Sequence, residues 1–211
     1  MERIVVAVVA GYLLGSIPFS YVTGRLARGI DLRRHGSGNL GAANTFRTLG
    51  AFPGVAVLLL DASKGAAGVL VAGLLWRADV GVSQRDLMLL GGVSSICGHI
   101  WTVFAGFKGG KGVASAAGVF AALAPPAFAA CVAVWVSVVA MFRYISLGSV
   151  AAAVCLPPAV YATLSPGNAD WRKAFAVSLV VAALVVLRHR GNLKRIRDGT
   201  EARFSIRGGA K

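Results

Sequence analysis

The sequence predicts an all-α integral membrane protein with seven transmembrane helices, on the basis of its composition, hydropathy pattern and charge distribution. Of the 211 residues, 56% are hydrophobic and 14% are charged, and the mean hydropathy is +0.71. This chain is far too apolar to be a water-soluble domain of the same size. The net charge of +14 indicates anionic partners, segments held at a negatively charged membrane surface, or both.

Five spans follow directly from the hydropathy, since a helix needs about 20 apolar residues to cross the bilayer. They cover residues 4–22, 52–76, 87–107, 147–164 and 174–187. The further apolar run 112–142 is too long for one crossing and has basic residues at both ends. Both ends are therefore expected at the cytoplasmic face, and Pro125 and Pro126 favour a break between them. We expect a hairpin of two short helices there, which makes seven spans.

The positive-inside rule sets the predicted orientation. With the N-terminus outside and the C-terminus in the cytoplasm, sixteen Lys and Arg residues lie in cytoplasmic segments and five lie in external ones. The sequence shows no internal repeat and no low-complexity linker. We therefore expect residues 1–211 to form a single membrane domain.

Four polar, glycine-rich segments all fall on the predicted cytoplasmic side. They comprise residues 32–47, 106–115, 143–149 and 188–201. The carboxylates on this side are Asp31, Asp198 and Glu201. They form no cluster able to hold Mg²⁺, and the sequence has no serine-hydrolase elbow and no zinc-protease motif. We therefore expect no metal and no cofactor, and a cationic site that binds phosphate-bearing ligands.

The segment 106–115 has the features of a phosphate-binding loop. Its candidate contacts are Lys108, Gly109, Gly110, Lys111, Gly112 and Ser115. Glycine lets backbone N–H groups approach a ligand closely, while lysine and a helix N-terminus supply positive charge. The segment does not match the P-loop pattern and follows a membrane helix instead of a strand, so nucleotide binding is not expected. The alternative is a flexible turn whose lysines only anchor the helix ends.

The segment 32–47 also offers hydroxyls, amides and glycines. Its candidate contacts are Ser37, Gly38, Asn39, Asn44 and Arg47. The planar guanidinium of Arg47 suits bidentate binding of an oxyanion. For each of the small polar residues taken alone, an ordinary turn is the alternative. Arg33 and Arg34 continue a basic run and are expected at lipid headgroups instead.

Ionisable and amide side chains at helical spacing give two further candidates. His189 and Asn192 are three residues apart, so a helix continuing from the last span would present both on one face to one ligand. His189 can act as acid, base or ligand, or it can simply hold a neighbouring loop. Asp61 and Lys64 have the same spacing inside the second span, where a structural pair is favoured over a proton or ion pathway. His99 is expected to hydrogen-bond between helices.

Together these segments resemble those of the bacterial membrane-bound glycerol-3-phosphate acyltransferases that use acyl-phosphate as donor. The likeness covers nearly the whole chain. The motifs that carry it are Leu14-Gly15-Ser16-Ile17-Pro18, Gly36-Ser37-Gly38-Asn39, Asn44, Gly98-His99, the run 107–115, Arg143-Tyr144, Arg188-His189-Arg190-Gly191-Asn192 and Gly199-Thr200-Glu201. The departures from the family pattern are Ala43, Thr102 and Gly191, of which only Gly191 touches a key motif.

The resemblance implies an integral enzyme of the bacterial inner membrane, with its active site on the cytoplasmic side. Such an enzyme transfers a fatty acyl group from acyl-phosphate to the 1-hydroxyl of glycerol 3-phosphate. The products are 1-acyl-glycerol 3-phosphate (lysophosphatidic acid), which enters phospholipid biosynthesis, and phosphate. The implied partners are these two substrates and membrane lipids, with no nucleic acid and no obligatory protein partner.

The resemblance also implies roles for individual residues. By motif position, the catalytic set is Ser37, Arg47, Lys111, His189 and Asn192. The glycine loop and Ser115 would surround a phosphate. A serine of the segment 143–149 would join them, and Ser149 is preferred over Ser146.

Two other classes of protein remain as alternatives. A phosphate or organophosphate carrier would also need cationic loops, but transporters usually place their site near the bilayer midplane, often within inverted repeats. A structural membrane protein would leave the four polar segments unexplained.

Overall fold

The computed structural model describes residues 1–164 and 171–204. Within these ranges the regular secondary structure is entirely helical, which confirms the predicted all-α class. The contacts divide the chain into two compact units, Met1–Leu123 and Ala124–Lys211.

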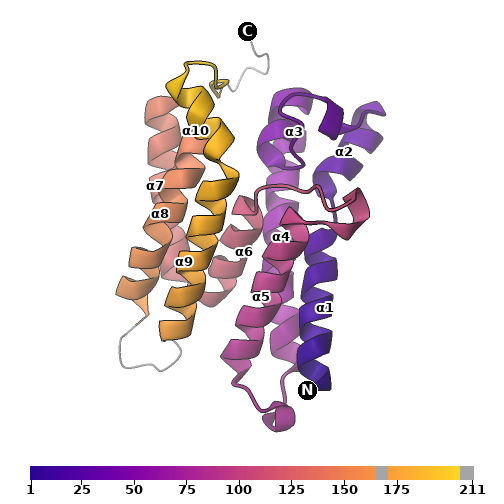
Figure 1. Cartoon of the computed structure of the whole chain (residues 1–211), viewed down its shortest axis with the longest axis vertical. Coiled ribbons are helices and arrows are strands. Elements are labelled where there is room, and N and C mark those ends of the chain that lie inside the picture. Colours follow the sequence, from indigo (N-terminus) through magenta and orange to yellow (C-terminus); the bar gives the residue numbers. More distant parts are fainter. Residues whose placement is uncertain (165–170, 205–211) are drawn as a thin grey trace. The chain divides into compact units, whose positions relative to one another are not determined.

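The first unit is built from six α-helices. They are α1 (Glu2–Ser16), α2 (Phe19–Arg28), α3 (Ala42–Leu49), α4 (Ala51–Leu75), α5 (Gln84–Ile100) and α6 (Val113–Leu123). Short 3-10 turns lie in the connections, namely η1 (Leu32–Arg34), η2 (Ala78–Val80) and η3 (Val103–Ala105). The helices α1, α4 and α5 pack against one another, and α6 packs against α4 (Figure 1).

Glycines let α1, α4, α5 and α6 touch through their backbones. A Cβ atom on Gly15 of α1 would collide with the backbone of Ser95 in α5. A Cβ atom on Gly118 of α6 would likewise collide with the backbone of Ala62 in α4. Lipid tails are as apolar as the helix surfaces, so helices in a membrane associate mainly through close van der Waals contact. Small residues therefore determine how the first unit packs.

The first predicted span is interrupted. The helix α1 ends at Ser16, two residues before Pro18, because a proline ring prevents the chain from continuing the helix. The continuous helix predicted over 4–22 is therefore wrong, although Glu2–Arg28 as a whole remains a candidate span. The break leaves the carbonyl of Ile17 without a partner in α1.

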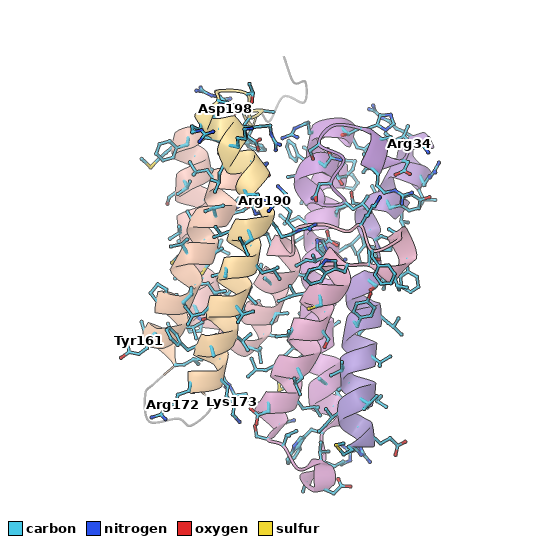
Figure 2. All side chains as sticks on the ribbon, viewed as in Figure 1. Arg34, Tyr161, Arg172, Lys173, Arg190 and Asp198 are labelled. Carbon is cyan, nitrogen blue, oxygen red and sulfur yellow. The ribbon has the colours of Figure 1, made fainter. Side chains whose placement is uncertain are left out.

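The second unit contains α7 (Pro125–Phe142), α8 (Ile145–Thr163), α9 (Trp171–Arg188) and α10 (Arg190–Arg197). In Figure 1, α8 packs against both α7 and α9. Arg172 and Lys173 lie at one end of α9, while Arg190 and Asp198 lie toward the other, in and after α10 (Figure 2).

The structure supports fewer spans than the sequence predicted. Among the described residues, five helical segments are long and apolar enough to cross a membrane, or six if the bent pair α9 and α10 forms one span. The apolar run 112–142 does divide, at Ala124. However, α6 has only 11 residues, or about 16 Å at 1.5 Å per residue, whereas the hydrocarbon core is about 30 Å thick. Seven spans are therefore not confirmed.

Candidate active site

Asn44, in the first turn of α3, shapes the loop that precedes this helix. Its Oδ1 accepts a hydrogen bond from the backbone N–H of Ser37 at 2.8 Å. Its Nδ2 donates to the carbonyls of Leu32 and His35, both at 3.1 Å. Gly38 has a φ of 70°, a conformation that glycine adopts without strain. The buried Asn44 amide is thus used to present Ser37.

Two predicted catalytic residues of this segment are exposed. Ser37 lies in the loop, and Arg47 lies in the last turn of α3. The guanidinium of Arg47 makes no hydrogen bond or ion pair with any residue in the described part of the chain. Asn39 is half-buried, and its carbonyl accepts a hydrogen bond from the N–H of Gly41 at 3.1 Å. This segment therefore offers a hydroxyl and a guanidinium to a ligand.

Arg33 forms an ion pair where the sequence suggested a contact with lipid headgroups. Its guanidinium donates to both carboxylate oxygens of Asp31, with a shortest distance of 2.7 Å. These hydrogen bonds outweigh the effect of desolvation and lower the pKa of Asp31 to about 2. Arg34 is exposed and points away from the unit (Figure 2).

The loop 106–112 rests on the C-terminal end of α5. The N–H of Gly109 donates to the carbonyl of Ile100 at 3.1 Å, and the N–H of Gly110 donates to that of His99 at 3.0 Å. A Cβ atom on Gly110 would collide with the His99 ring and with the carbonyl of Leu40, which belongs to the loop before α3. The two predicted phosphate-binding segments therefore lie side by side.

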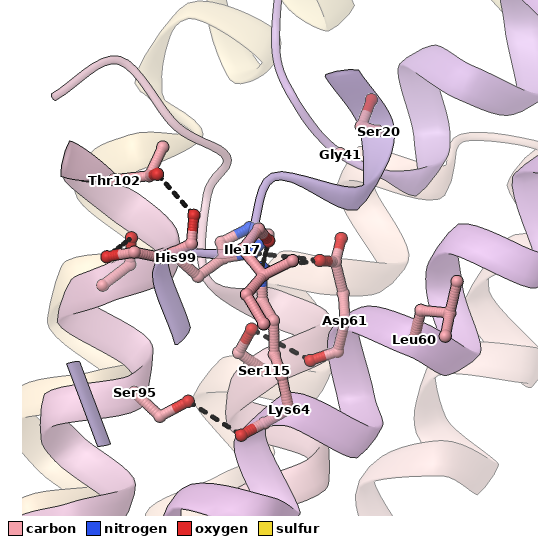
Figure 3. Close-up of polar contacts among 12 residues, drawn as sticks. Ile17, Ser20, Gly41, Leu60, Asp61, Lys64, Ser95, His99, Thr102 and Ser115 are labelled. Atoms are coloured by element: carbon pink, nitrogen blue, oxygen red, sulfur yellow. Dashed lines mark hydrogen bonds and ion pairs between the residues drawn. The ribbon is translucent and has the colours of Figure 1, made fainter. Parts of the chain in front are cut away.

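The same loop leads into the N-terminus of α6. Gly112 makes the turn with a φ of 85°, and α6 begins at the next residue. Ser115, in the first turn, is fully buried and donates its hydroxyl to the carbonyl of Asp61 at 3.1 Å (Figure 3). Lys108 is exposed and Lys111 is half-buried. Ser115 thus ties α6 to α4, and the lysines carry the charge of the loop.

In the second unit, Glu201 organises the polar residues around Asn192. Its Oε1 accepts hydrogen bonds from Nδ2 of Asn192 at 2.6 Å and from Oγ of Ser146 at 2.8 Å. Its Oε2 accepts one from Nε of Arg195 at 2.7 Å. Burial by itself would raise the pKa of Glu201, but these hydrogen bonds outweigh burial and lower the pKa. The ionised carboxylate therefore fixes the amide of Asn192.

His189 lies at a break between α9 and α10, so the expected helix continuing from the last span is wrong. That His189 and Asn192 serve one ligand stays a prediction. The helices α9 and α10 meet at a bend of 50°, and His189 is the N-cap residue of α10. Its Nδ1 lies 2.8 Å from the carbonyl of Val185, so Nδ1 carries the proton and Nε2 is the other ring nitrogen. The N–H of Asn192 donates to the carbonyl of His189 at 2.9 Å, so the two residues remain neighbours.

The two candidate serines of α8 have different partners. Ser149, which the sequence favoured, donates its hydroxyl to the carbonyl of Ile145 in its own helix at 2.9 Å. Ser146 instead joins Asn192 through the shared carboxylate of Glu201. Both serines are buried.

A family model described as glycerol-3-phosphate acyltransferase matches residues 5–199. The chain belongs to the glycerol-3-phosphate acyltransferase family. Its relatives include the glycerol-3-phosphate acyltransferase of Desulforudis audaxviator, with 44% identity over 98% of this chain and 100% of that protein. The one from Geobacter sulfurreducens is 43% identical over 97% of this chain and 98% of that protein.

Solved structures of the glycerol-3-phosphate acyltransferase family agree in fold. The crystal structure of PlsY (YgiH), an integral membrane glycerol 3-phosphate acyltransferase in its glycerol 3-phosphate form, superposes with a TM-score of 0.84. It shares 37% sequence identity, and the match covers 96% of both chains. The lysophosphatidic acid form of PlsY gives a TM-score of 0.82. This acyltransferase is thus an integral, multi-pass membrane protein, as the sequence predicted.

Sequence reasoning placed Glu201 in the motif Gly199-Thr200-Glu201 and among the cytoplasmic carboxylates, but it assigned this residue no role in the site. The available signal was an acidic residue in a motif that closely follows the strongly basic helix α10. Among the described residues, no group of three or more His, Cys, Asp or Glu side chains is placed to hold a metal ion.

Proposed function

We propose that this acyltransferase moves a fatty acyl group from acyl-phosphate to the 1-hydroxyl of glycerol 3-phosphate. The products are 1-acyl-glycerol 3-phosphate and inorganic phosphate. The match of residues 5–199 to the family, together with a relative solved in its glycerol 3-phosphate form, supports the acceptor. The glycine and lysine loop 106–112, which lies beside the loop of Ser37, supports a donor that also carries a phosphate.

The first unit is assigned the phosphate contacts. Arg47 and Lys111 hold phosphate oxygens, and Ser37 donates a hydrogen bond, with Gly38 and Asn39 beside it. The N–H groups of Gly109 and Gly110 donate to carbonyls of α5. These two glycines are therefore assigned another role: without a side chain, they let the phosphate approach the backbone closely. Backbone donors come instead from the first turn of α6, where N–H groups have no acceptor within the helix. Lys108 and Gly112 complete the loop, and Asn44 and Ser115 hold it in shape.

The second unit is assigned the hydroxyl contacts of glycerol 3-phosphate. Because Nδ2 of Asn192 donates to Glu201, its Oδ1 is the atom that can accept from a substrate hydroxyl. Because Nδ1 of His189 faces the carbonyl of Val185, its Nε2 is likewise an acceptor when the ring is neutral. A serine of α8 joins them. We retain Ser149 for this role and add Ser146, which shares the carboxylate of Glu201 with Asn192.

The chemistry follows from the donor. Acyl-phosphate is a mixed anhydride, so the 1-hydroxyl oxygen attacks the acyl carbon and the bond from that carbon to the phosphate oxygen breaks. Phosphate departs with the electron pair, and the hydroxyl proton passes to His189 or to a substrate phosphate. The enzyme then chiefly orients the hydroxyl and stabilises negative charge on the departing phosphate. The positively charged guanidinium and ammonium groups provide that stabilisation.

We further propose seven spans, with the N-terminus outside the bacterial inner membrane and the C-terminus in the cytoplasm. The sixteen-to-five distribution of basic residues supports this orientation. It places the loops 32–47 and 106–115 at the cytoplasmic face, where glycerol 3-phosphate is dissolved. The acyl chain of the donor is soluble in the bilayer.

Purified protein in detergent, supplied with glycerol 3-phosphate and either palmitoyl-phosphate or palmitoyl-CoA, tests the donor. We expect phosphate release and lysophosphatidic acid formation with palmitoyl-phosphate, and no product with palmitoyl-CoA. A reaction lacking glycerol 3-phosphate controls for simple hydrolysis. Equal product formation from palmitoyl-CoA would overturn the proposed donor.

A further inference from the structure

Three ionisable side chains are buried together where α4 meets α5 in the first unit (Figure 3). Asp61 and Lys64 of α4 and His99 of α5 are 1%, 4% and 5% exposed, and we call them the buried triad. Nζ of Lys64 lies 2.8 Å from Oδ1 of Asp61, and Nδ1 of His99 lies 3.4 Å from the same oxygen. Lys64 also donates to the carbonyl of Ile17 at 2.7 Å, at the break after α1.

Helix packing alone does not account for the buried triad. Desolvation offsets much of the attraction within a buried ion pair, and apolar residues of similar volume often serve stability as well or better. Contacts between small residues already pack α4 against its neighbours, as at Gly65 and Gly118. Charges inside a membrane protein are costly and usually mark a function. The triad therefore points to a role beyond holding helices together.

His99 connects the triad to both phosphate-binding loops. Its carbonyl accepts the N–H of Gly110 at 3.0 Å, and its Nε2 is the atom nearest to the position of a Cβ on Gly110. The carbonyl of Leu40, from the loop of Ser37, meets the same position. The two loops thus converge on one imidazole ring.

A small cavity beside this junction has room for about one water molecule. It is lined by the triad together with Leu40, Gly109 and Gly110. Oδ2 of Asp61 is buried and has no hydrogen-bond partner within the described ranges. A buried carboxylate oxygen is costly unless it accepts a hydrogen bond, so the cavity suits a water molecule that donates to Asp61.

We propose that the buried triad positions the loop 106–112 for phosphate binding. The carboxylate of Asp61 attracts the His99 ring across the 3.4 Å between Oδ1 and Nδ1, although the two atoms form no hydrogen bond, and Nε2 then faces Gly110. Lys64 balances the charge of Asp61, and its hydrogen bond to the carbonyl of Ile17 anchors the pair to the end of α1. None of the three is assigned a contact with substrate, so they are positioning residues. The inference rests on the proposed function in one respect, namely that this loop binds a phosphate-bearing substrate.

The first test measures amide hydrogen exchange over residues 106–115, which requires no enzyme turnover. His99→Asn keeps a nitrogen near Asp61 but removes the ring beneath Gly110. We expect at least roughly tenfold faster exchange in the loop, because opening of the loop would cost less free energy. Ser63→Ala is the matched control on α4, since Ser63 is exposed and its hydroxyl donates to the carbonyl of Leu60 in its own helix, at 3.0 Å. Unchanged exchange in His99→Asn would overturn the proposal.

The second test uses steady-state kinetics with glycerol 3-phosphate and palmitoyl-phosphate. We expect His99→Asn to raise the KM of one substrate roughly tenfold while kcat changes less than about threefold. Gly110→Ala should raise the KM of the same substrate, and the double variant should lose less than the product of the single losses. A loss confined to kcat would contradict positioning. A wild-type protein without turnover would contradict the proposed function instead, and the exchange experiment would still decide the role of the triad.

A charge-neutral double variant separates positioning from folding. Asp61→Asn alone leaves the ammonium of Lys64 buried and uncompensated, so its unfolding temperature should fall. Asp61→Asn combined with Lys64→Met removes both charges and should restore the unfolding temperature. The double variant should not return the KM of the affected substrate to the wild-type value, because the carboxylate that orients His99 is still absent. Recovery of both quantities would mean that the triad only packs helices.

Discussion

At the scale of single residues, Arg47 presents an exposed guanidinium from the last turn of α3. A lysine at this position keeps the charge but cannot form two parallel hydrogen bonds to a phosphate. We therefore expect Arg47→Lys to lower kcat/KM nearly as much as Arg47→Ala does. Phosphate release with saturating palmitoyl-phosphate and varied glycerol 3-phosphate, and the converse, measures the effect.

The control for Arg47 is Arg34, which is also exposed and also basic. If Arg34 only meets lipid headgroups, Arg34→Lys should leave turnover almost unchanged. Normal turnover in both lysine variants would show that Arg47 does not bind substrate.

Replacing Asn192 should lower kcat/KM for one substrate more than for the other. Loss of a hydrogen bond to a charged ligand costs about 1.5–3 kcal/mol, so Asn192→Ala should lower kcat/KM for glycerol 3-phosphate roughly tenfold to a hundredfold. The dependence on palmitoyl-phosphate should change less. Asn192→Ala combined with His189→Gln should lose less than the product of the single losses, because both residues serve one ligand. Strict multiplicativity, with an unchanged KM for glycerol 3-phosphate, would place the site elsewhere.

The carboxylate of Glu201 should make the free energy of unfolding depend on pH. Its pKa is lowered in the folded protein, so its contribution is complete above the ordinary value of about 4.5 and is lost as the pH falls through the folded pKa. We expect Glu201→Gln to be less stable than wild type at pH 7 and to lose less additional stability on acidification. Unfolding temperatures in detergent from pH 7 to pH 3 measure this. Parallel curves for the two proteins would show that the carboxylate is not stabilised by folding.

At the scale of elements, glycine contacts determine the packing of α4 with α6. A Cβ atom on Gly118 would meet backbone atoms of Ala62, which cannot move aside, whereas one on Gly73 would meet the flexible side chain of Met88. We expect Gly118→Ala to lower the unfolding temperature by several degrees. Gly73→Ala should be neutral or stabilising, because alanine is the better helix former. Equal effects of the two substitutions would contradict the packing described here.

The positions of the long helices could be predicted from hydropathy, and their internal breaks only in part. The limits of α4 and α8 agree with the predicted spans to within a few residues, because apolar length alone sets them. The break at Pro125 was visible, since proline acts locally. Pro18 gives the same local signal for the end of α1, but the predicted span treats residues 4–22 as one apolar run. The bend at His189 has no proline beside it and was not predicted.

The candidate site was predictable as a set of loops but not as a set of contacts. Sequence identified Ser37 and the glycine loop, because glycine and small polar residues are conspicuous between apolar runs. It did not show that Asn44 and Ser115 direct their side chains inward, since the same residue types serve turns and ligands equally well. Nor did it place His99 beneath Gly110, which depends on how two distant segments fold together.

At the scale of the whole molecule, the orientation in the membrane can be tested by cysteine labelling. In a background without native cysteines, Asp79→Cys, in the turn η2, should react with an impermeant reagent added to intact cells. Arg34→Cys should react only after the cells are opened, because its loop is expected in the cytoplasm. Both positions are exposed. Labelling of Arg34→Cys from outside would overturn the orientation and the cytoplasmic placement of the site.

Turnover should not require a divalent metal. The expected site is cationic, and phosphate charge would be met by Arg47 and Lys111 without a bridging ion. We expect unchanged rates of phosphate release after treatment with EDTA. Activity that is lost with EDTA and restored by Mg²⁺ would contradict the proposed mechanism.

The ion pair inside α4 also bears on how the chain enters the membrane during synthesis. Asp61 and Lys64 are one turn apart, so they can neutralise each other as soon as this helix forms. The additional acceptor of Lys64, the carbonyl of Ile17, lies at the break after α1 and leaves the ribosome earlier. Lateral transfer of α4 into lipid therefore does not have to wait for His99, which is synthesised later. The nascent chain can thus bring two opposite charges into the bilayer as one nearly neutral unit.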